Sequence, residues 1–355
     1  MRLPPDDPRR SLPKPEWPEP HRRAFEAATR TAGLLDEPGA LAHLARLTVD
    51  RYASAWGHFL TYRRLHDPMP PDEPLEACLT PERVADFIRR MRPRLAPQTV
   101  QHRIVGIYLV GRAIVPGKDL AWLKRIAAVV SYRPAATRNK AAMLHPTHEL
   151  VAAGIRLMDE AEARIGGNPR RRAAQHRNGL TLALLALRPL RSRNFSTLEL
   201  ERHLVRDGSG WRIVVEAGET KAGNRIELPF PAELIPHLER HLECWRPILL
   251  GGRASERLWI SMHGRALDAL KLYNLVGSIT EKLFGKRMSL HIFRDCAATH
   301  VAIHDPEHMG VATALLGHRS MATTQRHYNL ARSREAASLM QQAVLELRRR
   351  ATKLG

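Results

Sequence analysis

The chain has 355 residues, more than a single hydrophobic core normally supports, so we expect two folded domains. Lys and Arg outnumber Asp and Glu by 56 to 36, and the net charge of +20 favours a polyanionic partner, with nucleic acid the first to consider. The longest apolar run, Leu182 to Leu187, is too short to span a membrane, and three cysteines without a paired spacing favour a reducing, cytoplasmic setting.

The first twenty residues are rich in proline. Seven of residues 1–20 are Pro, and most of the others are charged. Such a composition buries little apolar surface, which predicts a disordered tail. No apolar stretch follows the basic residues, so we do not expect a signal peptide here.

Residues 21–132 have helical periodicity, and four helices stand out. The first begins near Thr48, a candidate N-cap, and the second opens with Thr80 and Pro81, a cap followed by a proline suited to the first turn. The third follows Pro97 and the fourth follows Asp119. Their apolar and aromatic residues are spaced as core residues rather than as base-stacking platforms. The expected core positions are Val49, Tyr52, Trp56, Phe59, Leu60, Val84, Phe87, Ile88, Met91, Val100, Ile104, Ile107, Tyr108, Leu120, Trp122, Leu123 and Ile126.

Residues 133–146 have little periodicity and contain basic residues between two prolines, as an interdomain linker would. We expect Arg138 and Lys140 in this linker to contact phosphates of a nucleic-acid partner. The second domain then covers residues 147–332, with helices near 147–164 and 172–187. Alternating β-branched residues within 203–229, broken at Asp207-Gly208 and at 222–224, predict three short antiparallel strands. From about residue 231 helices are expected almost to the end.

Arg191 and Lys221 are the first two residues suited to phosphate chemistry. Pro189 forces a break after an apolar helix, which predicts that Arg191 lies at a helix N-terminus, where a guanidinium can bind two phosphate oxygens. Lys221 lies in the turn between two predicted strands. Because Arg outnumbers Lys 47 to 9 in this chain, a lysine here is unusual, and its ammonium can lose a proton while a guanidinium effectively cannot. Each residue alone could equally be an ordinary surface charge.

Three further segments complete a candidate set. His291 and Arg294 are three residues apart and share a helix face. His318 follows Gly317, the expected end of a helix, and Tyr328 lies ten positions further on. Each of these alone could be a structural residue.

Taken in order, Arg191, Lys221, His291, Arg294, His318 and Tyr328 resemble the catalytic set of the tyrosine recombinase (phage integrase) family. The likeness covers nearly the whole chain after the tail. It is strongest over 291–331, HIFRDCAATHVAIHDPEHMGVATALLGHRSMATTQRHYNLA, which is similar to the family's His-x-x-Arg, Leu-Gly-His and nucleophile boxes. One departure is Asn194, since family members often carry Glu three residues after the first catalytic Arg.

The resemblance implies a mainly α fold with a small antiparallel β-sheet. An N-terminal helical core-binding domain over 21–132 would bind DNA, and an α+β catalytic domain over 147–332 would follow it. Tyr328 would attack a DNA phosphate to give a 3′-phosphotyrosyl bond, and a neighbouring strand's hydroxyl would reverse the step. Arg191, Arg294 and His318 would contact the phosphate, His291 would assist proton transfer, and Lys221 would protonate the leaving 5′ oxygen.

No cofactor and no metal are expected for this chemistry. His300, His304 and His308 recur every four residues, but Asp305-Pro306 interrupts the helix and no carboxylate or Cys completes a known site, so packing or surface roles are expected. Arg225, on the same hairpin as Lys221, is expected to bind DNA. The expected function is site-specific recombination in a bacterial cytoplasm, on the nucleoid when bound.

The alternatives are a type IB topoisomerase and a non-catalytic DNA-binding regulator on the same scaffold. The sequence leaves open the target site and whether the role is integrase, resolvase or transposon recombinase. Residues 333–355 should form a C-terminal helix whose apolar stripe either folds back on its own domain or, as in similar recombinases, docks on a neighbouring protomer. The expected partners are therefore double-stranded DNA and three further copies, a homo-tetramer on two DNA sites that can be a monomer without DNA. The residues of the stripe are Ala336, Leu339, Met340, Ala343, Val344 and Leu347.

Overall fold

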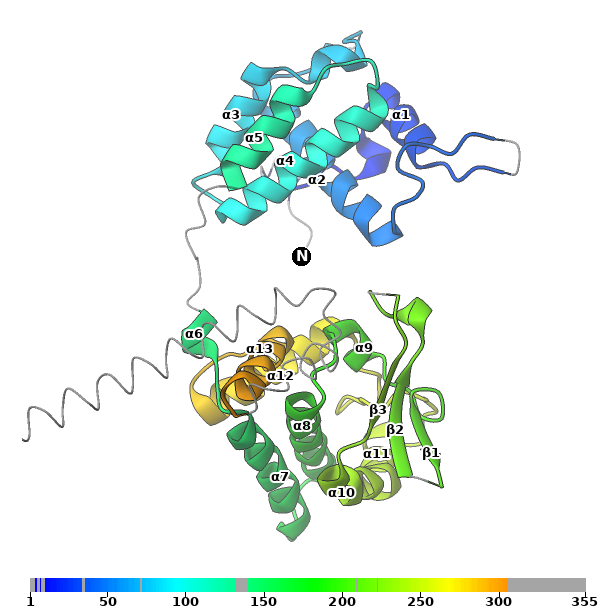
Figure 1. Ribbon diagram of the computed structural model, residues 1–355, viewed down its shortest axis with the longest axis vertical. Coiled ribbons are helices and arrows are strands. Elements are labelled where there is room, and N and C mark those ends of the chain that lie inside the picture. The colour runs from blue at the N-terminus through cyan, green and yellow to red at the C-terminus, as the bar shows by residue number, and fades with distance from the viewer. Residues whose placement is uncertain are drawn as a thin grey trace, which may run out of the picture. The chain divides into compact units, whose positions relative to one another are not determined.

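In this computed structural model the chain forms two compact units, residues 1–138 and 139–355 (Figure 1). The structure describes Pro4, Asp7 and residues 10–33, 36–70, 72–131, 140–208, 210–221 and 223–304. Most of the elements in these ranges are helices, and a small antiparallel sheet lies in the second unit, so the predicted fold class is confirmed. Among the described helices none has the length and apolarity to cross a membrane.

Unit 1 is a bundle of helices around one core. The helices are α1 (Glu19–Thr29), α2 (Arg46–His66), α3 (Pro81–Met91), α4 (Pro97–Ile114) and α5 (Ala121–Ser131), with 3-10 turns at Lys14–Glu16 and Leu75–Cys78. The predicted apolar faces form this core, and Trp56, Phe59 and Phe87 have no exposed surface. Thr80 caps α3 as predicted, its Oγ1 accepting from the Arg83 backbone N–H at 3.3 Å. The capping prediction for Thr48 is wrong, because α2 begins earlier, with Ala45 at its N-cap.

The prediction that residues 1–20 form a disordered tail is wrong for residues 10–20. Leu12 and Trp17 are buried in the core of unit 1, and α1 begins at Glu19. The Leu12 N–H donates to the Gly57 carbonyl at 3.1 Å, and the Trp17 indole donates to the Leu12 carbonyl at 2.8 Å. A Cβ at position 57 would lie 2.4 Å from the Leu12 carbonyl oxygen, so Gly57 permits this close contact.

Unit 2 begins with α6 (Lys140–Met143), followed by α7 (Thr147–Ala163) and α8 (Pro169–Leu187), which pack closely. Gly154 and Gly179 lie at their crossing, where a Cβ on either would come within 2.7 Å of the other's carbonyl oxygen. The predicted linker over 133–146 is too long at its C-terminal end. Met143 and Leu144 pack against the core of unit 2, so 140–146 belongs to this unit.

The sheet has the order β1-β2-β3, all antiparallel, as predicted. The strands are β1 (Leu204–Asp207), β2 (Gly210–Val215) and β3 (Ile226–Pro229). The connection between β2 and β3 includes a 3-10 turn at Ala217–Glu219. Ile213 and Val215 point into the core, so the sheet covers one side of the helices.

The remaining helices surround α8. They are α9 (Ser192–Ser196), α10 (Ile235–Arg240), a π-helical turn (His241–Trp245), α11 (Arg246–Leu250), α12 (Ala269–Phe284) and α13 (Leu290–His304), with a 3-10 turn at Ala232–Leu234. Both α12 and α13 pack against α8, and α12 also packs against α9. The expectation of helices throughout from residue 231 is wrong for 251–268, where Gly251 and Gly252 have positive φ and end α11.

Candidate active site

Arg191 lies where the sequence predicts it, at the start of a helix. The apolar helix α8 ends at Leu187, the chain turns at Pro189, and Arg191 is the N-cap residue of α9. This helix has only five residues, so its dipole adds little, and any anion held here depends on the guanidinium itself.

Arg294 comes from a segment about a hundred residues later and is bound to the same turn. It is 6% exposed, and its Nη1 donates to the Pro189 carbonyl at 2.6 Å. Burial, and then the positive charge of Arg191, lower the pKa of Arg294 to about 10, despite the opposing effect of the Asp295 carboxylate. The fold therefore places Arg191 and Arg294, from two distant segments, at one turn, an arrangement suited to binding an anion.

The turn that carries Arg191 is held from other sides as well. The Arg188 Nε donates to the Pro229 carbonyl at the end of β3, at 3.0 Å. On α9 the Phe195 carbonyl accepts from the Trp259 indole at 2.7 Å, and the two rings stack with centroids 5.0 Å apart. These contacts fix the backbone of the turn and hence the position from which Arg191 extends.

Lys221 is exposed at the tip of the connection between β2 and β3, as predicted. The preceding Thr220 is buried, and its Oγ1 donates to the Asn224 carbonyl at 2.8 Å, which closes the turn. Gly223 has a φ of +74°, a conformation that suits glycine. The lysine is thus presented to solvent from an ordered turn.

Asn194 connects this hairpin to α9. Its buried side chain donates from Nδ2 to the Glu219 carbonyl at 3.1 Å, two residues before Lys221. The Glu219 carboxylate in turn contacts His203 Nε2 at 3.3 Å and Arg202 Nη2 at 2.7 Å. In the sequence, Asn194 stands out only as a departure from the pattern of the tyrosine recombinases. The structure shows that it joins the segments carrying Arg191 and Lys221.

His291 lies on α13, one turn before Arg294. Its side chain is 65% exposed, and its Nε2 is 3.9 Å from Asp295 Oδ1. Arg225, predicted to bind DNA, forms ion pairs with Glu216 at 3.2 Å and Glu227 at 2.6 Å, so a phosphate would have to compete with two carboxylates.

Several predicted residues lie outside the described part of the chain. They are Arg138, His308, His318 and Tyr328, together with 333–355. Lys140 begins α6 and His304 ends α13, but their side chains are not described. The structure therefore has Arg191, Lys221 and Arg294 on connected segments, and His291 lies one turn before Arg294 on α13.

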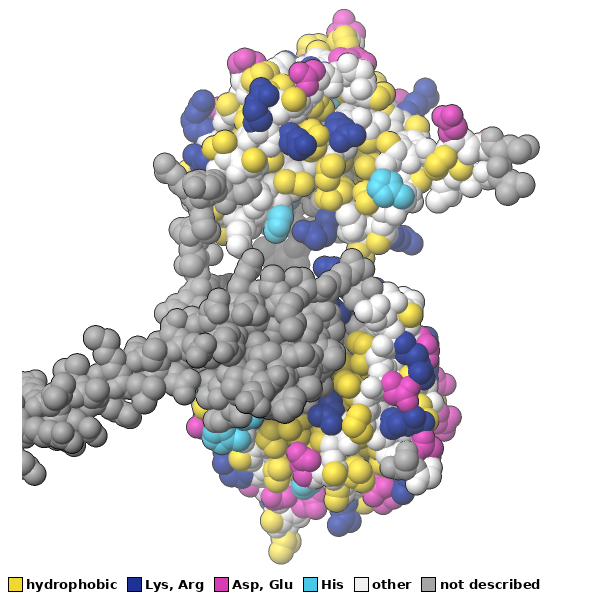
Figure 2. Space-filling model, in the orientation of Figure 1, with side chains coloured by type: hydrophobic (Ala, Val, Ile, Leu, Met, Phe, Trp, Pro, Cys, Tyr) yellow, Lys and Arg dark blue, Asp and Glu magenta, His cyan; other side chains and the backbone are white. Residues whose placement is uncertain are grey.

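Unit 1 carries a basic pocket that sequence analysis did not predict. A cavity of about 340 Å³ between α2 and α4 is lined by Arg51, His58, His102 and Arg103, and none of its described lining residues is acidic. Arg103 Nη2 lies 3.0 Å from His58 Nε2. Burial, and then Arg103, lower the pKa of His58 to about 4, so this imidazole is neutral and the charge of the pocket comes from the arginines. Figure 2 shows many Lys, Arg and His side chains on the visible face of unit 1, with Asp and Glu mainly near its margins.

Known proteins of similar sequence are tyrosine recombinases, although no protein-family model matches the chain. The chain is 33% identical over 108 residues to tyrosine recombinase XerD of Pseudomonas aeruginosa. The aligned segment covers 30% of this chain and 36% of the relative. The chain is also 25% identical over 234 residues to XerD of Staphylococcus aureus (strain Mu50). This longer alignment covers 63% of this chain and 77% of the relative. The matched part of the chain spans only about a third of the length of several XerD relatives, the Pseudomonas aeruginosa protein among them.

Solved structures share the fold across almost the whole chain. The XerH site-specific recombinase bound to its difH substrate has a TM-score of 0.57 at 17% identity, over 96% of this chain and 99% of that one. The Tn1549 transposon integrase in complex with transposon right end DNA has a TM-score of 0.51 at 14% identity, over 90% and 98%. In sequence over part of its length, and in fold over almost all of it, the chain is therefore similar to tyrosine recombinases.

Proposed function

We propose that this protein is a site-specific DNA recombinase that cuts and rejoins strands through a covalent bond to Tyr328. The observation that carries the proposal is the pairing of Arg191 with Arg294, because two distant segments deliver guanidinium groups to one turn. A guanidinium binds phosphate oxygens through parallel N–H bonds, and two of them can neutralise the charge that develops on a phosphorane. The resemblance to tyrosine recombinases supplies the remaining residues, His318 and Tyr328.

In the proposed reaction the Tyr328 hydroxyl oxygen attacks a DNA phosphorus. A P–O bond to tyrosine forms as the bond to the 5′ oxygen breaks, leaving a 3′-phosphotyrosyl ester and a free 5′ hydroxyl. His291 assists removal of the tyrosine proton, and Lys221 gives a proton to the departing oxygen. Attack by the 5′ hydroxyl of another strand reverses the step. Because the ester conserves the bond energy, no cofactor is consumed.

The decisive experiment uses a DNA substrate with a nick near the point of exchange, so that the cleaved end diffuses away and the ester cannot be reversed. We expect the wild-type protein to form a covalent protein–DNA complex that survives denaturation. The Tyr328→Phe variant should form none, yet bind the DNA with unchanged affinity, because only the nucleophilic oxygen is removed. DNA binding by the wild-type protein without any covalent product would instead identify a non-catalytic regulator.

The assembly is measured on the same trapped complex. We propose four protomers on two DNA sites, held by residues 333–355 docking on a neighbour, with a monomer in the absence of DNA. Light scattering on DNA that carries the site should then give four protomers for the wild-type chain and fewer after deletion of 333–355. Relaxation of supercoiled DNA without exchange between two sites would point to a topoisomerase. We further propose that the protein acts in the cytoplasm, on the nucleoid when it is bound to DNA.

DNA contact is proposed for both units and the segment between them. The basic pocket between α2 and α4 supports a phosphate-binding surface on unit 1. We propose that Arg138 and Lys140 lie along phosphates and that the two units close around the duplex. Arg225 would join them once its ion pairs with Glu216 and Glu227 open.

Replacing Arg138 and Lys140 with Ala should weaken binding to all DNA sequences alike. The slope of log K against log salt concentration should become shallower by about two, because two phosphate contacts are lost and each contributes about 0.9 to the slope. The measurement is DNA affinity between low and physiological salt. As a charge-matched control, Ala at Arg22 and Arg23, which pair with Glu19 at 2.6 Å, should leave the slope nearly unchanged. An equal slope for both double variants would contradict the linker contact.

A further inference from the structure

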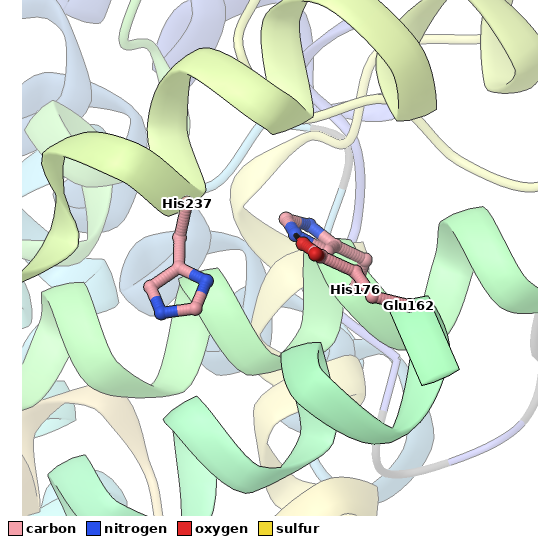
Figure 3. Close-up of side chains that lie close together, drawn as sticks. All are labelled: Glu162, His176 and His237. Carbon is pink, nitrogen blue, oxygen red and sulfur yellow. Dashed lines mark hydrogen bonds and ion pairs between the residues drawn. The ribbon is translucent and has the colours of Figure 1, made fainter. Parts of the chain in front are cut away.

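A second polar cluster lies in unit 2, where three helices meet. Glu162 is on α7, His176 is on α8 and His237 is on α10 (Figure 3). One ligand atom from each residue lies within 4.8 Å of the others. His176 Nε2 is 3.1 Å from Glu162 Oε1, and Figure 3 shows His237 carried by a separate helix beside this pair. Because the three residues are far apart in sequence, only the fold brings them together.

The donor set matches the preferences of zinc. Two imidazole nitrogens and one carboxylate oxygen, with a fourth position for water, form a common zinc site. When donor atoms lie about 2.0–2.1 Å from a tetrahedral zinc ion, they are roughly 3.3 Å from one another. The distances between the donor atoms of this cluster must therefore shorten by about 1.5 Å at most. His237 is half-buried and the Glu162 side chain is 32% exposed, so both can rotate toward the fully buried His176.

An independent observation points to a ligand at the same place. His241 is fully buried and stacks on His176, with ring centroids 5.6 Å apart and planes 4° apart. Neither of its ring nitrogens has a hydrogen-bond partner among the described residues, and neither does His176 Nδ1. Buried polar atoms are normally partnered, so three unpartnered imidazole nitrogens in one spot call for an explanation.

The backbone around His241 is also unusual. His237 and His241 are four residues apart, the spacing that puts two ligands on one helix face. At His241 the chain changes from α10 to a π-helical turn, and such turns recur at functional sites.

Arg177 and Arg246 act on His241, and two further cations lie at Glu162 itself. Arg240 Nε lies 3.8 Å from Glu162 Oε2, and Arg172 donates to the Glu162 backbone carbonyl. The Arg240 side chain is 57% exposed and can turn into solvent, and the Arg172 bond leaves the carboxylate available. Neither cation therefore blocks the three donors.

We propose that Glu162, His176 and His237 bind one zinc ion, and that His241 partners the ion or its bound water. The site lies toward the N-terminal end of α8, whereas Arg191 follows its C-terminal end. Eleven residues of helix from His176 to Leu187 correspond to roughly 16 Å. The ion would therefore tie α7, α8 and α10 together and stabilise unit 2 without touching the reacting phosphate.

Zinc binding is tested on the full-length protein after treatment with a chelator. Titration with zinc chloride against a chromophoric competitor should show one tight site per chain, and zinc should raise the melting temperature by a few degrees, reversed by EDTA. His237→Gln and Glu162→Gln should each weaken this site by at least tenfold. Cobalt(II) in the wild-type protein should give the visible absorption of a tetrahedral N/O site, and both variants should lose it.

His148→Gln is the matched control, because it removes an exposed histidine from α7, the helix that carries Glu162. It should bind zinc as tightly as the wild-type chain. Both Gln variants change partly exposed side chains, so their melting temperatures without zinc should stay close to that of the wild type. The proposal is overturned if the wild-type protein has no stoichiometric site, or if its site is equally tight in His237→Gln and Glu162→Gln.

Discussion

Replacing Arg294 with Ala should slow DNA strand cleavage by about a thousandfold or more, because it removes one of the two guanidinium groups assigned to the reacting phosphate. Arg294→Lys keeps the charge but loses the planar fork that binds two oxygens, so it should recover only part of the rate. Affinity for intact DNA should change far less, because the other phosphate contacts remain. The measurement is single-turnover formation of the covalent complex on the nicked substrate.

The control must separate lost chemistry from lost folding, since Arg294 is buried and donates to the Pro189 carbonyl. Arg177 on α8 is closely matched. It is buried, its Nη1 donates to the Ile260 carbonyl at 2.6 Å, and burial lowers its pKa to about 10. Each Ala variant leaves a buried carbonyl without this donor, which should cost about 1–3 kcal/mol of unfolding free energy. If folded Arg177→Ala lost cleavage as severely as Arg294→Ala, the role of Arg294 at the phosphate would be refuted.

Most of the fold could be predicted because periodic burial leaves a direct trace in sequence. Trp56, Phe59 and Phe87 recur at helical spacing and are completely buried, and the alternation across 203–229 gives the three strands. The segment over 10–20 could not be predicted in this way. Leu12 and Trp17 are single apolar residues among prolines, with no period, and their burial depends on a site on α2 that appears only after folding.

The candidate site was predictable residue by residue, and its connections were not. Arg191, Lys221 and Arg294 each have a local signal, such as a proline break, a turn or a helical spacing. The bond from Asn194 to the Glu219 carbonyl joins residues 25 positions apart and has no local signal. The same holds for Glu162, His176 and His237, which come from three helices. A search of histidine spacings that extended to His237 and His241 would have found part of that cluster.

Lys221→Ala should slow cleavage by about 10²–10⁴-fold with little change in DNA affinity, because the general acid is lost while the phosphate contacts remain. Lys221→Arg should be nearly as slow, since a guanidinium holds its proton too tightly to give it away. A substrate with sulfur in place of the 5′-bridging oxygen should restore the rate of both variants. A thiolate leaves without protonation, because its conjugate acid has a pKa near 8.5, far below that of an alcohol.

Asn194→Ala should show the same rescue on a smaller scale if this side chain positions the hairpin that carries Lys221. Loss of the bond to the Glu219 carbonyl should let the turn move and slow cleavage of normal DNA by about tenfold, while the sulfur substrate is cleaved at nearly the wild-type rate. Arg225→Ala, on the same hairpin, removes a positive charge without removing the acid. It should weaken DNA binding, and the sulfur substrate should not compensate for that loss.

If the sulfur substrate left Lys221→Ala as slow as before, Lys221 would not be the general acid. If it rescued Lys221→Ala but not Asn194→Ala, Asn194 would act on the fold of α9 and not through the lysine.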